Sequence, residues 1–165
     1  MSITKDTRVW EKMKNNFKQA EQYEGRLGWF PEDRYGSDNG NLPMAYIAYL
    51  NEVGHKNGAD AVIPGAETPP RPFMRVNLKN ALKAGANDKE FRKMVEAVVE
   101  GKSILQPLKA SSAAFKDTLR KVMLDFDNPP NAALTVEMKG FDDPLIKTSQ
   151  LVANVNSKVA KKGAD

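Results

Sequence analysis

Three prolines lie within four positions directly before a helical pattern, in the segment TPPRPFMRVNLKNALK at residues 68–83. Because an X-Pro step disfavours the α conformation of the preceding residue, three residues are predicted to be extended: Thr68, Pro69 and Arg71. Pro72 has a φ that suits a first helical turn and lacks an N–H group that this turn would leave unbonded. The sequence therefore predicts a stiff lead-in, which loses little entropy on ordering, and a helix from about Pro72 to Ala84 that stops at Gly85.

The same segment carries basic residues at intervals of four, which places them along one helical face: Arg71, Arg75, Lys79 and Lys83. Most of its apolar side chains fall elsewhere on the helix and are expected to pack inward: Phe73, Met74, Val76, Leu78 and Leu82. The basic row has two interpretations. It is either a solvated face or a ridge that meets an acidic neighbouring subunit or DNA.

Periodicity outside this segment predicts four further helices. They are expected over 6–19, from Asn41 as a possible cap to Gly54, from Asn87 or Asp88 to Gly101, and from Ser103 to Phe126. Apolar residues surround most of the second of these helices, so it is expected to be well buried. Its tyrosines, Tyr46 and Tyr49, are assigned to the core in preference to an interface.

Two stretches have the alternation of a strand. Tyr23, Gly25, Leu27 and Trp29 alternate within 23–30, although the glycines leave little side chain to pack. The segment 151–162 reads as a strand in preference to a weak helix, because valine and asparagine are poor helix formers. The segments 31–41 and 55–70 are expected to be loops, the first with a turn at Asp38-Asn39-Gly40. The prediction is one α+β domain over 1–165, with several helices packed on a small, mostly antiparallel sheet.

Composition restricts the class of protein. The 165 residues contain no cysteine, which excludes disulfides and thiolate catalysis and fits a reducing cytoplasm. No apolar run approaches the ~20 residues that cross a bilayer, and no signal-peptide pattern is present, so no membrane association is expected. The net charge of +4 is too small to indicate nucleic-acid binding by itself. A chain that is 41% hydrophobic is expected to satisfy its own core and to be monomeric or weakly associated when made alone.

The sequence offers no set of residues suited to catalysis. His55 is the one histidine and follows a predicted helix end, which is typical of a surface residue. Glu52 is three residues away, but the chain has no second histidine and no cysteine to complete a metal site with His55. Asp142 and Asp143 precede Pro144 and are interpreted as a turn or a helix start. No phosphate-binding loop, dinucleotide fingerprint or nucleophile elbow occurs, so neither an enzyme nor a cofactor is expected.

Several blocks occur in an order that resembles a known family. They are Gly28-Trp29-Phe30, the helix MAYIAYLNEVG with Glu52-Val53-Gly54 at its end, and IPGAETPPRPFMR. A fourth block, Pro144-Leu145-Ile146-Lys147-Thr148-Ser149-Gln150, has Lys147 and Ser149 where the family usually has Asp and Gly. PGAET lengthens the loop before the prolines. Together these blocks, over about 22–84 and 141–160, resemble the tail-completion or neck proteins of long-tailed bacteriophages.

The resemblance implies a structural virion protein in the neck or collar, made in the host cytoplasm. It would form a homo-oligomeric ring, most often of six copies, around the DNA channel, with possible contact to the DNA. Its partners would be a head-completion or adaptor protein and the tail terminator or tail tube protein. Trp29, Tyr35 and Tyr46 are suitable aromatic anchors. The expected interface residues are Trp29, Tyr35, Pro69, Pro70, Arg71, Phe73, Arg75, Lys79 and Lys83.

Two other classes stay open. One is a small DNA-binding protein that uses the basic row together with Lys158, Lys161 and Lys162, although no named DNA-binding module is present. The other is a small enzyme such as a nuclease or a phage lysin, which would need Glu52, Asp142 or Asp143 for activity.

Overall fold

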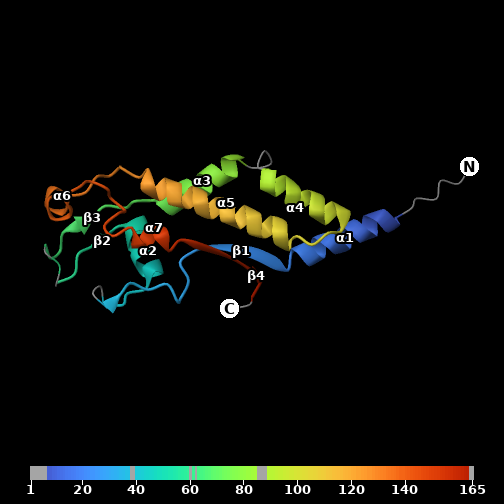
Figure 1. Cartoon of the computed structure of the whole chain (residues 1–165), viewed down its shortest axis with the longest axis horizontal. Coiled ribbons are helices and arrows are strands. Elements are labelled where there is room, and N and C mark those ends of the chain that lie inside the picture. The colour runs from blue at the N-terminus through green and yellow to red at the C-terminus, as the bar shows by residue number, and fades with distance from the viewer. Residues whose placement is uncertain (1–6, 38–39, 60, 62, 85–88, 164–165) are drawn as a thin grey trace, which may run out of the picture. The chain divides into compact units, whose positions relative to one another are not determined.

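The chain forms two compact units, each built from segments that are far apart in the sequence. The computed structural model describes residues 7–37, 40–59, 61, 63–84 and 89–163 (Figure 1). Unit 1 is drawn from Met1–Leu27, Lys83–Ala114 and Ser157–Asp165, and unit 2 from Gly28–Leu82 and Phe115–Asn156. The described residues form seven helices and two small antiparallel sheets, which confirms the predicted α+β class. A single domain over 1–165 stays a prediction.

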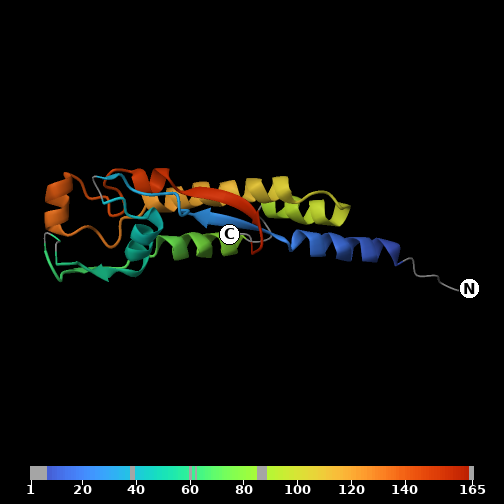
Figure 2. The ribbon, with the colours of Figure 1, turned by 90° about the horizontal axis from the view of Figure 1, so that it is seen from below.

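Unit 1 is organised around two helices, α1 (Arg8–Ala20) and α4 (Lys89–Glu100), which pack against each other (Figure 2). The side chain of Asn16 donates a 3.0 Å hydrogen bond from Nδ2 to the carbonyl oxygen of Val98. Gly101 ends α4 with a φ of +73°, as predicted. The predicted helix start at Asp6 and the predicted caps at Asn87 and Asp88 lie outside the described residues, as does Gly85.

One glycine of the first predicted strand, Gly25, has a packing role. The strand β1 (Tyr23–Gly28) pairs with β4 (Asn156–Lys161) in a two-stranded sheet. The long helix α5 (Leu105–Leu124) passes Gly25 so closely that a Cβ there would lie 2.3 Å from Ser112 Oγ. A glycine therefore allows the strand to approach the helix. The predicted covered face is wrong at Leu27, whose side chain is 37% exposed.

Unit 2 contains α2 (Met44–Val53), most of α3 (Phe73–Ala84), the second half of α5, α6 (Ala133–Lys139) and α7 (Gln150–Ala153). The predicted loop 55–70 contains an antiparallel pair, β2 (His55–Lys56) with β3 (Glu67–Thr68). The sequence predicted neither this pair nor α6. In the predicted strand 151–162, the first three residues belong to α7, and β4 (Asn156–Lys161) forms the strand. The helices α2 and α7 lie side by side in both views (Figures 1 and 2).

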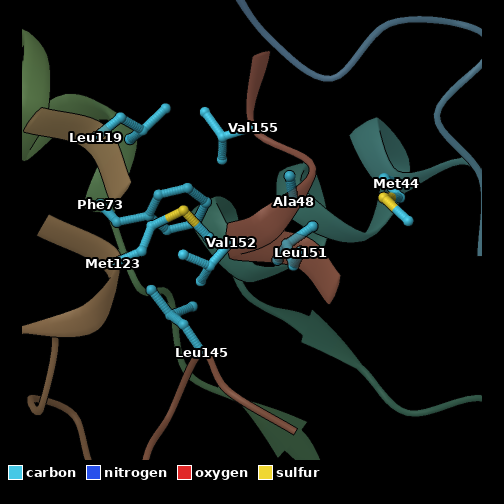
Figure 3. Packing of buried hydrophobic residues seen from close by; sticks show 9 residues of the cluster. All are labelled: Met44, Ala48, Phe73, Leu119, Met123, Leu145, Leu151, Val152 and Val155. Carbon is cyan, nitrogen blue, oxygen red and sulfur yellow. The ribbon is translucent and has the colours of Figure 1, made fainter. Parts of the chain in front are cut away.

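The core of unit 2 joins all of these helices except α6. Figure 3 shows Phe73 and Met123 together with Val152 within the cluster of buried side chains. Phe73 and Met123 are fully buried, and Val155 is 1% exposed. Trp29 packs on this cluster: its ring meets Phe73 edge-on with centroids 6.2 Å apart, and its Nε1 donates to the carbonyl of Leu151 at 2.8 Å. Because α5 and α7 supply much of this core, the segment 28–82 cannot complete it alone.

The helix α2 is half exposed, so the prediction of a well-buried helix is wrong. One face carries the buried residues Met44, Ala48 and Glu52. Another presents Tyr46 and Tyr49, which are 51% and 57% exposed. Their assignment to the core is therefore also wrong. The helix begins at Met44 with Pro43 at the N-cap, so Asn41 is not its cap.

Candidate interface around the proline segment

The end of α2 supplies the N-terminal cap of α3. Glu52 is 6% exposed, and its two carboxylate oxygens accept hydrogen bonds from the backbone N–H groups of Met74 and Arg75, at 2.8 and 3.2 Å. Its Oε1 also lies 3.0 Å from Nε of Arg75. The first N–H groups of a helix have no partner within the helix, and the positive end of its dipole favours an anion. Glu52 therefore stabilises α3 from a neighbouring helix.

At Gly54 the chain packs directly against residues 68–72, which we call the proline segment. It adopts φ +76° and ψ 163°, a conformation that is almost restricted to glycine. A Cβ at Gly54 would lie 2.8 Å from both the nitrogen of Pro70 and the carbonyl oxygen of Thr68. The backbone N–H of Arg71 then donates to the carbonyl of Asn51 at 2.7 Å. The end of α2 and the proline segment are thus one packed module, which we call the α2–α3 junction (residues 51–54 and 68–75).

Arg71 is buried, which corrects its placement on an exposed basic row. Its side chain is 6% exposed and bonds to the 129–131 loop, with acceptors Pro129 O, Pro130 O and Asn131 Oδ1 at 3.3–3.5 Å. Burial lowers the pKa of Arg71, and the negative charge of Asp142 raises it. The side chain therefore holds the proline segment to this loop.

The other expected interface residues divide by exposure. Phe73 is fully buried, so it contributes to the core and offers no surface. Trp29 and Tyr35 are half-buried against the same core, and burial raises the pKa of Tyr35. The exposed members are Pro69, Pro70, Arg75, Lys79 and Lys83. Arg75 is exposed yet paired with Glu52, so two members of the four-residue basic row are already engaged within unit 2.

The inward packing expected for α3 is also only partly correct. Phe73 is buried and Met74 packs on the core, but Val76, Leu78 and Leu82 are 38%, 58% and 73% exposed. These three side chains are in contact with water. A further segment or another molecule would have to cover them to bury them.

A cavity of about 850 Å³ lies beside the α2–α3 junction, within unit 2. Its wall is formed by the β2–β3 pair, the proline segment, α6 and the residues leading into α7. Side chains of Ile63, Leu134 and Met138 supply apolar surface, and Arg71, Lys139 and Lys147 supply positive charge. Two buried polar atoms of wall residues, Asn131 Nδ2 and Gln150 Oε1, have no hydrogen-bond partner among the residues that the structure describes. This volume is in the range of ligand-binding clefts.

His55 and Asp142, two residues that the sequence offered as candidates for chemistry, each make a separate local contact. His55 lies in β2, half-buried, with Nδ1 3.4 Å from the carbonyl of Leu50. Asp142 accepts a 2.9 Å hydrogen bond from the backbone N–H of Asn131, and the predicted turn begins at Asp143, whose carbonyl accepts from the N–H of Ile146. In the part of the chain that the structure describes, no group of three or more histidines and carboxylates could hold a metal ion. Within the same residues no helix has the length and apolar character to span a bilayer.

Sequence reasoning did not find the roles of Glu52, Asn131 or Lys139. Glu52 carried a usable signal, because a single acidic residue at the end of an apolar helix is out of place unless it has a buried partner. The positions of Asn131 and Lys139 depend on long-range packing and had no such signal. Comparison of the chain with protein-family models, with curated proteins and with solved structures finds no match.

Proposed function

We propose that this chain is a structural subunit of a phage head-to-tail connector, the neck or tail-completion component. It assembles as a ring of about six copies around the DNA channel, between a head-completion or adaptor protein and the tail terminator or tail tube. The observation that carries the proposal is the α2–α3 junction. The Glu52-Val53-Gly54 block and the PPRPF block, on which the resemblance depends, pack against each other as one module.

The last block of the resemblance gives separate support. Ser149 stands where the family usually has glycine, and it adopts a left-handed conformation with φ +58°. A glycine adopts this conformation without steric cost. The backbone at this position is therefore the one that the family's glycine would favour.

Two helices carry stripes of exposed apolar side chains. These stripes support a subunit whose apolar surface is buried when it assembles with other subunits. Tyr46, Tyr49 and Val53 follow one face of α2, at 39–57% exposure. Phe91, Val95 and Val99, spaced four apart on α4, are 41–46% exposed. Such contiguous stripes mark interaction surfaces, and tyrosine is enriched among residues that dominate binding energy. They argue against the expectation of a chain that satisfies its own core and stays monomeric.

The alternative of a small DNA-binding protein has less support. Of the basic row, Arg71 is buried and Arg75 is paired with Glu52. Among the described residues, this leaves Lys79 and Lys83 as the exposed members that have no carboxylate partner. Two lysines of the row neutralise too few phosphates for strong binding to duplex DNA, so the alternative depends on Lys158, Lys161 and Lys162 of unit 1.

Sedimentation and electron microscopy of the purified chain test the proposal. We expect concentration-dependent association and closed rings among the class averages. A chain that stays monomeric at every concentration and binds duplex DNA in a salt-sensitive manner would overturn the proposal in favour of the DNA-binding alternative.

The double variant Tyr46→Gln, Tyr49→Gln identifies the contact surface. Both side chains are exposed, so we expect an unchanged melting temperature together with loss of rings. Leu124→Gln is the matched control, because Leu124 is 52% exposed in the same unit but lies on α5. Rings formed equally well by the double variant would exclude the α2 stripe as the subunit contact.

A further inference from the structure

At the wall of the cavity beside the α2–α3 junction, Arg71 has hydrogen-bond donors that the described residues do not use. The buried guanidinium of Arg71 has five N–H donors, and its hydrogen bonds to described residues are long and use Nε and Nη2 alone. All three acceptors are neutral oxygens, and none of the described carboxylates lies within ion-pair distance of it. A buried cation without a paired anion is costly.

The charge at the wall is positive. Lys139 donates to the carbonyl oxygen of Asp143 and lies over the ring of Phe141 at 4.9 Å. Burial lowers its pKa, as do the positive charges of Arg71 and Lys147, against the opposite effects of Asp143 and Asp142. Among the described residues of the lining, Glu67 supplies the one carboxylate, which is 78% exposed and lies 3.7 Å from Nζ of Lys56. The described residues of the lining thus carry more positive than negative charge, with Asp142 and Asp143 acting on Arg71 and Lys139 from beside it.

The unsatisfied atoms fit a ligand with amide or carboxylate groups. Asn131 Nδ2 is a donor and Gln150 Oε1 is an acceptor, and both are buried with no partner in the described part of the chain. Other residues of the wall, among them Leu134 and Met138, are apolar. This mixture suits a peptide, which carries N–H and C=O groups together with side chains, better than a nucleic-acid backbone, which offers acceptors alone along its phosphates.

We propose that this cavity binds an extended acidic segment of a partner protein, with a carboxylate placed against Arg71 and Lys139 and apolar side chains placed against Leu134 and Met138. The segment supplies a carboxylate at ion-pair distance, which the described residues do not provide to Arg71 although the charge of Asp142 acts on it. On rotation of the Gln150 and Asn131 side chains, its backbone N–H and C=O groups reach Gln150 Oε1 and Asn131 Nδ2. The site is independent of ring formation, so its test does not depend on the proposed function.

Fluorescence anisotropy with a labelled probe peptide measures the binding. The probe is acetyl-Leu-Asp-Leu-Asp-Leu-amide, whose blocked termini leave the aspartates as its charges. A matched peptide with asparagine in place of aspartate tests the charge. We expect the aspartate peptide to bind at least about tenfold more tightly than the asparagine peptide, and its affinity to fall with added salt.

Variants locate the site. Lys139→Gln and Lys147→Gln should each weaken binding of the aspartate peptide, Lys139→Gln by about tenfold, because it removes a partly buried charge. Lys121→Gln is the control: Lys121 is exposed in the same unit and lies outside the cavity wall. If Lys139→Gln lowers the melting temperature, Lys147→Gln still tests the site, because Lys147 is exposed and its replacement should leave the fold intact. In the unmodified chain, the side-chain amide signals of Asn131 should shift on peptide addition.

Three results would overturn the proposal. They are equal binding of the two peptides, equal loss of affinity in Lys121→Gln and Lys139→Gln, and an Asn131 amide signal unmoved at saturation. Competition by an oligothymidine at lower concentration than the peptide would assign the cavity to nucleic acid instead.

Discussion

At the residue scale, Gly54 has two independent reasons to be glycine. Its backbone conformation is almost closed to other residues, and the carbonyl of Thr68 and the nitrogen of Pro70 occupy the space of a Cβ. Both neighbouring groups belong to the stiff proline segment, which cannot yield easily. A side chain at this position would therefore force the backbone itself to move, at a cost in folding free energy.

Gly54→Ala should lower the free energy of unfolding by at least about 2 kcal/mol, because strain in this region alone costs 1–3 kcal/mol. Urea denaturation of the full chain measures it. Gly58→Ala is the control, since no atom lies within 4 Å of a Cβ there and its φ is not in the left-handed range. Equal stability of the two variants would mean that the junction relaxes freely.

Tyr35 provides a pH-dependent prediction. Burial raises its pKa above 10.0, so the folded state keeps its proton at pH values where the unfolded state has lost it. Its contribution to stability is therefore present below pH 10 and is lost as the pH rises through the folded-state pKa. The free energy of unfolding should fall more steeply above pH 10 in the unmodified chain than in Tyr35→Phe. Parallel pH profiles of the two proteins would contradict this.

At the scale of elements, α3 depends on a cap that its own sequence does not contain. The proline segment fixes where the helix begins, but the residues directly before it have no side chain that reaches its first N–H groups in the described contacts. Glu52 of α2 supplies both acceptors instead. The pairing of α2 with α3 is consequently specified by polar contacts as well as by the apolar core.

Glu52→Ala should lower the free energy of unfolding by about 1–3 kcal/mol, because two backbone N–H groups lose their acceptor. Arg75→Met separates this capping from the ion pair. The Arg75 side chain is 69% exposed, so solvent screens the pair and its loss should cost about 0–1 kcal/mol. Equal destabilisation in the two variants, measured by thermal and urea unfolding, would assign the effect of Glu52 to the ion pair.

At the scale of the whole molecule, the chain passes between its two units four times. Neither unit is therefore a continuous piece of sequence. The core of unit 2 needs Leu119 and Met123 from α5 and Leu151, Val152 and Val155 from the C-terminal part, in addition to Phe73.

A fragment limited to residues 28–82 should be unfolded, because it retains Met44, Ala48 and Phe73 but loses every buried core residue beyond them. Circular dichroism and the dispersion of amide signals test this. Cooperative melting of the fragment would show that the α2–α3 junction and the β2–β3 pair are stable without α5 and α7. The full chain, measured in the same buffer, is the reference.

The sequence by itself determined the elements whose signals are local. Proline and glycine fixed the start of α3 and the ends of α2 and α4, because these residues restrict or extend backbone conformation whatever surrounds them. Apolar periodicity located the five longest helices and the α+β class. Short elements such as the β2–β3 pair and α6 have too few residues for a periodic signal. Tertiary structure alone decided which faces are buried: it placed Arg71 inside and Tyr46 outside, and it brought Glu52 to α3 and Lys139 to Arg71. Burial depends on contacts between segments distant in the chain, and no pattern within one helix contains that information.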